Sequence, residues 1–272
     1  MSRVVELTTY PIKGCAGVPL TEASLTEAGL AHDRSFMVVD ERGVFRSQRR
    51  DPRLAVVRPH VTAGGEQLTL GAPDAEDLRI DVDRTSARVD VELFGTPYQG
   101  IDQGDTASEW LSEVLGKPSR LVRVPPEHGR VTDGLTPGTS GYADSSAVHI
   151  LSVSSLEKLN QRIAVSGGSP LLMTRFRPNV VVDGWDAPHL EDRARRISVG
   201  NAELGYAKLA IRCAVTLVDQ ASGAKAGPEP LRTLAGYRRA AEGGVAFGSN
   251  FSVLRTGELA VGDDVIVTEW AD

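Results

Sequence analysis

The sequence predicts a β-rich α+β fold with a seam near residues 121–128. Short segments of alternating polar and apolar residues follow one another at nearly regular spacing through the first third of the chain. This pattern is typical of antiparallel barrels and sandwiches, and only a few stretches show a helical period. Hydrophobic residues make up 41% of the 272 residues, enough to bury a core in one large or two modest domains.

Strands fill the N-terminal part of the sequence, and each is broken by glycine, proline or a polar turn. The expected segments are residues 3–14, 34–45 (two strands around a turn at 41–43), 54–73 and 78–95.

Helical periods appear at three places. Apolar residues share one stripe in the first stretch, and Gly116 marks its end. Capping-box spacing or an initial proline marks the start of each helix. The marker residues are Thr106 with Glu109, Ser154 with Glu157, and Pro230.

The second half of the chain returns to strands after a Pro/Gly-rich stretch, residues 124–146. That stretch is expected to be either a long loop over a site or a mobile connection. Strands are expected within residues 147–152, 176–184, 196–219 (a hairpin whose second strand carries Cys213) and 250–270.

Composition excludes several classes of protein. The formal net charge is −6 and the pI is about 5.5, which argues against a nucleic-acid or anionic-membrane partner. Two cysteines cannot form a disulfide framework or a four-cysteine metal site. The N-terminus has no long apolar core. These features predict a protein of the reducing cytoplasm.

Cys213 is open to several readings. A lone strand cysteine is most often a small buried hydrophobe, but it can also be an inert thiol or a ligand for a soft metal. Arg212 precedes it, yet neighbouring strand residues face opposite ways, so the two need not touch. No G-x-S-x-G, H-E-x-x-H or phosphate-loop motif is present. A dyad of Cys213 with one of the five histidines stays open.

Cationic and polar residues gather at predicted strand ends beside glycine or proline. Lys13, Arg34, Arg177 and Asn179 are of this kind. Each alone is typical of a solvated strand edge. The loop at residues 138–146 is rich in glycine and hydroxyls and is either a plain loop or a phosphate cradle. Together with one thiol, these groups would suit an anionic ligand that carries a soft metal.

Seven segments spread over nearly the whole length share a distinctive order. They are "YPIKGCAG", "GLAHDRSFMVVDERGVFRSQRR", "YADSSAVHILSVSSLEKLN", "RFRPNVVVDG", "IRCAVTLVDQASG", "EPLRTLAGYR" and "FGSNFSVLRTGELAVGDDV". In these segments the chain resembles the MOSC family of molybdenum-cofactor proteins, and within it the mitochondrial amidoxime-reducing component and its bacterial counterparts. The resemblance implies an N-terminal MOSC β-barrel subdomain over residues 1–122 and a MOSC domain, a β-barrel with flanking helices, over residues 123–272.

The resemblance also implies residue roles. Cys213 would be the protein ligand to molybdenum and the catalytic residue. Gly14 stands where relatives often carry serine, so a hydroxyl contact would be lost there, and Asn250 stands where the human-type relatives have an aromatic residue. The residues expected to bind the molybdenum cofactor (Mo-molybdopterin) are Lys13, Gly14, Arg34, Asp144, Ser145, Ser146, Arg177, Asn179, Arg212, Cys213 and Asn250.

The implied activity is an oxidoreductase that reduces N-oxygenated small molecules such as hydroxylamines and amidoximes. Its electrons would come from a separate flavin, haem or iron–sulfur protein, and no nucleic acid or membrane would take part. Two alternatives remain: a molybdenum-cofactor sulfur transferase or carrier that uses a Cys213 persulfide, and a non-enzymatic cofactor-binding protein. Asp219 is either a proton donor or a turn cap.

Overall fold

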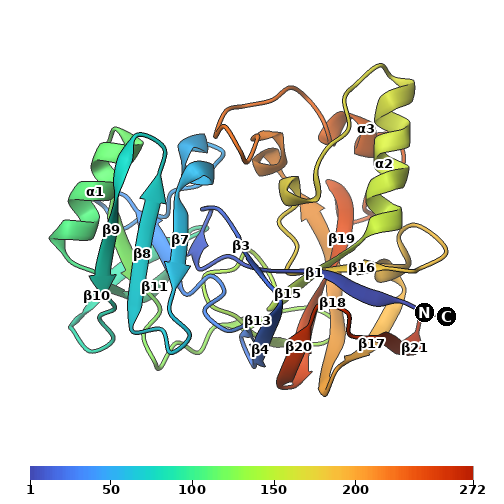
Figure 1. The fold of residues 1–272 in the computed structure, drawn as a ribbon, viewed down its shortest axis with the longest axis horizontal. Helices are drawn as coiled ribbons and strands as arrows, with labels where there is room; N and C mark the ends of the chain where they lie inside the picture. The colour runs from blue at the N-terminus through green and yellow to red at the C-terminus, as the bar shows by residue number, and fades with distance from the viewer. Residues whose placement is uncertain (272) are drawn as a thin grey trace.

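A computed structural model describes residues 1–271 of the chain. Strands dominate it, with three α-helices among these residues, so the predicted β-rich α+β class is confirmed. Figure 1 shows strands β7–β11 with α1 on one side of the molecule and the largest sheet with α2 and α3 on the other. None of the helices in residues 1–271 combines the length and apolar character needed to cross a lipid bilayer.

The largest sheet has eight strands, and all its neighbouring pairs are antiparallel except β15 with β16. Its central strand β15 (Val148–Ser152) is buried at every position, which is why its sequence does not alternate. The strand order is β21 (Val265–Trp270), β17 (Ala194–Val199), β18 (Ala202–Arg212), β19 (Val245–Arg255), β15, β16 (Val180–Asp183), β1 (Arg3–Thr9) and β3 (Val18–Leu20).

Two further sheets form the N-terminal side. The five-stranded sheet has the order β10 (Arg88–Leu93), β11 (Thr96–Asp102), β12 (Arg120–Arg123), β6 (Phe36–Val39) and β2 (Ile12–Lys13). The other contains β7 (Arg58–Val61), β8 (Gln67–Ala72) and β9 (Ala75–Asp81). Helix α1 (Asp105–Leu115) packs its apolar stripe into the same core as Cys15.

The first thirty residues tie the two sides together. Strand β1 pairs with β16, and β4 (Glu22–Thr26) pairs with β20 (Gly257–Ala260) and β5 (Gly29–Leu30). In β4 alternate residues are buried, as expected for a strand with one face on a core. The division at residue 122 stays a prediction, and these strands hydrogen-bond across it.

The three predicted helices exist, but the N-terminal caps of the first two differ from the predicted ones. Helix α1 begins after Gly104, which has no side chain to cap it, so the predicted capping box of Thr106 with Glu109 is wrong. Its predicted end is confirmed: Gly116 takes the left-handed conformation at φ +70°. Helix α2 (Val153–Val165) is capped by Ser152, which accepts from the Ser155 amide, and not by Ser154. Helix α3 (Leu231–Ala235) follows Pro230, as predicted.

Some predicted strands are shorter or absent. Residues 52–56 form a 3-10 helix, and residues 44–45 make only isolated bridges. The 124–146 stretch carries a small hairpin of β13 (Val131–Thr132) and β14 (Gly138–Thr139). The predicted hairpin of β17 and β18 is confirmed, but β18 ends at Arg212. Cys213 therefore lies just past the strand and precedes the 3-10 helix Ala214–Leu217.

Candidate functional site

One pocket of about 410 Å³ collects every residue assigned to a site by sequence analysis. Lys13, Gly14 and Arg34 come from the N-terminal side. The other eight come from strands of the large sheet, from the segments that adjoin β16 and β18, and from the loop before β15. The pocket also takes in residues that sequence reasoning missed, namely Phe45, Arg46, Ser47, Gln48, Arg49, Phe94 and His149. Most of these belong to "FRSQRR", a segment to which the sequence assigned no roles.

Lys13 holds the loop that carries the predicted cofactor hydroxyls. Its ammonium donates to the Tyr142 carbonyl at 2.8 Å and to the Asp144 carboxylate. Burial lowers the pKa of Lys13, while Asp144 opposes that shift. Desolvation in the pocket would raise the pKa of Asp144, whose side chain is 69% exposed, but the Lys13, Arg34 and Arg212 charges outweigh it and hold that pKa well below its usual range. Asp144 is therefore ionised in the pocket wall, and one N–H of Lys13 remains for a ligand.

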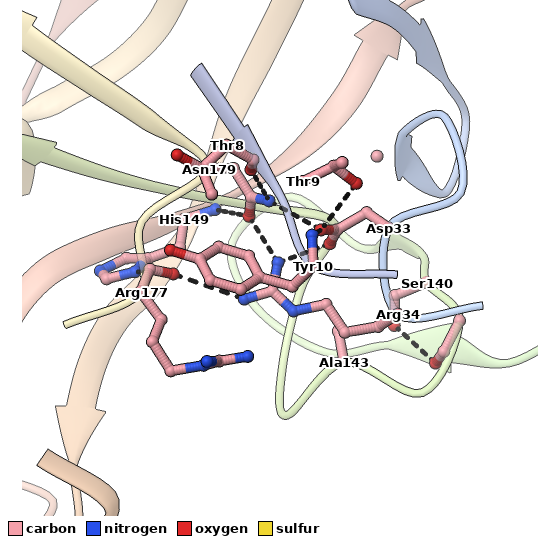
Figure 2. Close-up of polar contacts among 12 residues, drawn as sticks. Thr8, Thr9, Tyr10, Asp33, Arg34, Ser140, Ala143, His149, Arg177 and Asn179 are labelled. Atoms are coloured by element: carbon pink, nitrogen blue, oxygen red, sulfur yellow. Dashed lines mark hydrogen bonds and ion pairs between the residues drawn. The ribbon is translucent and has the colours of Figure 1, made fainter. Parts of the chain in front are cut away.

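A buried network fixes Arg34 and Asn179 (Figure 2). Arg34 Nη1 donates to Asp33 Oδ2 at 2.5 Å and to Asn179 Oδ1 at 2.9 Å. Asp33 Oδ1 accepts from the Tyr10 amide at 2.8 Å and from Asn179 Nδ2 at 3.0 Å. Asn179 also pairs with the Thr8 carbonyl and the His149 amide. Its two polar atoms thus have four protein partners, which makes Asn179 an organiser of the wall.

Arg34 and Arg177 share an aromatic platform. Their guanidinium carbons lie 4.4 and 4.2 Å from the centre of the Tyr10 ring, within the range of cation–π attraction. Figure 2 shows the Tyr10 side chain close to both arginines. Both arginines have positive φ, 45° and 57°, a conformation that non-glycine residues seldom adopt. Such backbone strain clusters at functional sites.

Several buried polar atoms in the pocket wall have no partner. Burial lowers the pKa of both Arg177 and Arg212, yet each keeps one unpaired N–H donor there. Burying such atoms is costly unless a ligand pairs with them. Six atoms are of this kind: Arg46 Nε, Ser145 Oγ, Ser146 Oγ, His149 Nε2, Arg177 Nη2 and Arg212 Nε. The five other than His149 Nε2 can all donate a hydrogen bond, which suits an anion with several oxygens.

The two cysteines occupy opposite environments. Cys15 is fully buried in the N-terminal core, and burial raises the pKa of its thiol to about 12. Cys213 is half-buried and lines the pocket. Within residues 1–271 no three His, Cys, Asp or Glu side chains gather in a metal-binding cluster.

Two further residues bear on the sequence predictions. Asp219 caps a turn: its Oδ1 accepts from the Ser222 amide and hydroxyl at 2.9 and 2.8 Å, and it does not line the pocket. Those hydrogen bonds, with Arg175, lower its pKa. His149 is a polar residue inside a buried strand, which is the sequence signal that could have singled it out. Burial and the Arg212 charge lower its pKa well below the usual value, so its ring is neutral.

Comparisons with known proteins agree with this arrangement. The MOSC N-terminal beta barrel domain model matches residues 1–118, and the MOSC domain model matches residues 137–266. Mitochondrial amidoxime-reducing component 1 of Homo sapiens is 32% identical over 96% of this chain and 82% of its own length. Component 2 of Rattus norvegicus is 34% identical, over 94% and 80%. The molybdenum cofactor sulfurase of Danio rerio is 31% identical over 90% of this chain but only 31% of its own length.

Proposed function

Because the chain belongs to the MOSC family, in the group that includes the mitochondrial amidoxime-reducing components, we propose that it is a molybdenum-cofactor-dependent reductase of N-oxygenated compounds. The substrates would be hydroxylamines and amidoximes. Two electrons from a separate donor protein and two protons would convert the N–O group to N–H and water. The observation that carries the proposal is the set of unpaired buried donors around one accessible thiol.

The wall fits the cofactor in charge and chemistry. Molybdopterin carries a phosphate, and the unpaired donors of Arg177, Arg212, Ser145 and Ser146 would bind its oxygens. Cys213 would supply a thiolate, a soft ligand that suits molybdenum. When bound, the cofactor supplies the two-electron chemistry at the N–O bond.

The remaining site residues act on the wall itself. Lys13 fixes the 142–144 loop through two hydrogen bonds. Asn179 and Asp33 orient Arg34, and Tyr10 supports both Arg34 and Arg177. These contacts hold the donors in place before the ligand arrives, which reduces the entropy lost on binding.

A second candidate function is sulfur transfer to the cofactor, with Cys213 carrying a persulfide. The match to molybdenum cofactor sulfurase favours it. The two functions differ in what the protein retains: a reductase keeps one molybdenum per chain and turns over substrate, whereas a carrier gives up its sulfur once.

The test measures molybdenum content and benzamidoxime turnover, with a reduced viologen dye as electron source, in protein made in a host that synthesises the cofactor. Wild type should hold metal and turn over. Cys213→Ser should stay folded and lose turnover, because a serine hydroxyl is too weakly acidic and its oxygen too hard a donor to replace a thiolate. Cys15→Ser is the matched control and should keep both properties. Full turnover by Cys213→Ser would overturn the ligand assignment.

A further inference from the structure

The turn between β10 and β11 holds a residue that the turn itself does not favour. Leu93 pairs with Thr96, so Phe94 and Gly95 alone form the loop. Both have positive φ, 55° and 79°, as in a type I′ hairpin turn, whose first position favours asparagine, aspartate or glycine. A phenylalanine in this conformation is sterically costly. A residue that breaks the preference of its own turn, with no compensating gain in that turn, is often functional.

Phe94 reaches the pocket described above. It lines that pocket while 46% of its surface stays exposed. Its ring packs edge-on against Phe45, with ring centres 4.7 Å apart. Ile211, 44% exposed, lines the same pocket from the end of β18, two residues before Cys213. Phe45, Phe94 and Ile211 are here called the apolar rim.

Most charges beside the apolar rim on its N-terminal side are already paired. The Lys13 ammonium, 4.9 Å from the centre of the Phe94 ring, is paired with Asp144. Arg46 Nη1 lies 3.5 Å from Asp51 Oδ2. The Arg49 guanidinium lies 5.9 Å from the centre of the Phe94 ring. A cationic group would find no unpaired carboxylate among the described residues that line the pocket on this side, whereas a neutral aromatic group would gain contact with both phenylalanine rings.

We propose that the apolar rim binds an uncharged aromatic substituent of the substrate, and that Phe94 determines specificity for it. The inference rests on the proposed function, because it assigns the substrate class of the same pocket. The rim and the polar wall line the same pocket, and the rim draws residues from both sides of the molecule. A bound molecule could therefore place its N–O group near Cys213 and its aromatic group on the rim.

The test compares kcat/KM for benzamidoxime and for acetamidoxime, which lacks the ring, with a reduced viologen dye as donor. Phe94→Asn should lower kcat/KM for benzamidoxime about tenfold, which corresponds to about 1.4 kcal/mol. The kcat/KM for acetamidoxime should stay within about twofold of wild type. Molybdenum content should not change. The melting temperature should stay the same or rise, because asparagine suits the turn. Leu135→Asn is the control, because Leu135 is an exposed apolar residue outside the pocket. This variant should change neither of the two kcat/KM values nor the molybdenum content.

Other outcomes overturn the inference. Equal losses for the two substrates would make Phe94 a general structural residue. An unchanged rate for both with the dye, but a loss with a protein donor, would make the rim a docking surface for that donor. If wild type binds molybdenum but reduces neither substrate, the proposed function fails instead, which the control measurements distinguish.

Discussion

Replacing Asp33 with asparagine should destabilise the protein strongly, although Asp33 was not among the predicted site residues. Its side chain is 1% exposed. It accepts from Arg34 at 2.5 Å and from the Tyr10 amide and Asn179 at 2.8 and 3.0 Å. The Arg34 side chain is itself only 14% exposed, so water cannot readily replace the lost partner.

The magnitude follows from this burial. Asparagine keeps one acceptor oxygen but removes the negative charge that compensates the guanidinium of Arg34. Removing one partner of a buried ion pair costs about 3–5 kcal/mol. Since natural domains are stable by about 5–15 kcal/mol, Asp33→Asn should lose about a fifth or more of the free energy of unfolding.

Urea unfolding of the protein without cofactor, followed by tryptophan fluorescence, measures this loss. Glu269→Gln is the matched control, because its pair with Arg196 spans 3.9 Å and is half or more exposed. Such pairs contribute about 0–1 kcal/mol. If Asp33→Asn costs no more than Glu269→Gln, the buried network does not hold the wall and the reasoning is refuted.

Three other outcomes are expected. Tyr10→Phe should cost about 1 kcal/mol through its hydrogen bond to a carbonyl. Tyr10→Leu should cost about 2 kcal/mol more and weaken cofactor retention, because the guanidinium groups lose the ring; equal losses would contradict this. Both ring nitrogens of His189 are buried without a hydrogen-bond partner, and burial and two arginines lower the pKa of the ring to about 4. The unfolded chain binds a proton below about pH 6.5, so stability should fall from pH 6.5 toward 4. His189→Asn should abolish roughly 1–2 kcal/mol of that fall after solvent screening, as pH-dependent unfolding would measure. Ser152→Ala should cost about 1 kcal/mol and Ser154→Ala less, with the reverse order contradicting the observed cap.

The sequence predicted the strand-rich class because alternation and turn residues are local signals. The prediction was wrong where a local pattern allowed two positions for a helix cap or for the end of a strand. Ser154 with Glu157 has capping-box spacing, but Ser152 ends a buried strand and begins the helix, and tertiary packing decides between them. Cys213 continues an apolar run by composition, yet β18 ends one residue earlier.

The family resemblance selected eleven residues, and all of them line one pocket, although their roles stay predictions. Residues that join the site through long-range contacts were not selected. Asp33 escaped notice because its role depends on Asn179, 146 residues away. Phe94 was not predicted, because two structural features single it out: its positive φ and its contact with Phe45. No sequence pattern indicates either feature.

The crossing of the first thirty residues explains why one pocket can draw on both sides of the molecule. Val4, Leu7, Leu25 and Leu30 are buried in the core of the large sheet. At about 1.5–3 kcal/mol for each such side chain, this burial contributes about 6–12 kcal/mol as an upper estimate. That is comparable to the whole stability of a domain. The same segment carries Tyr10 and Lys13 to the pocket wall. A ligand that binds there contacts both sides, and at a hundred times its Kd it should stabilise the folded protein against unfolding by about 2.7 kcal/mol.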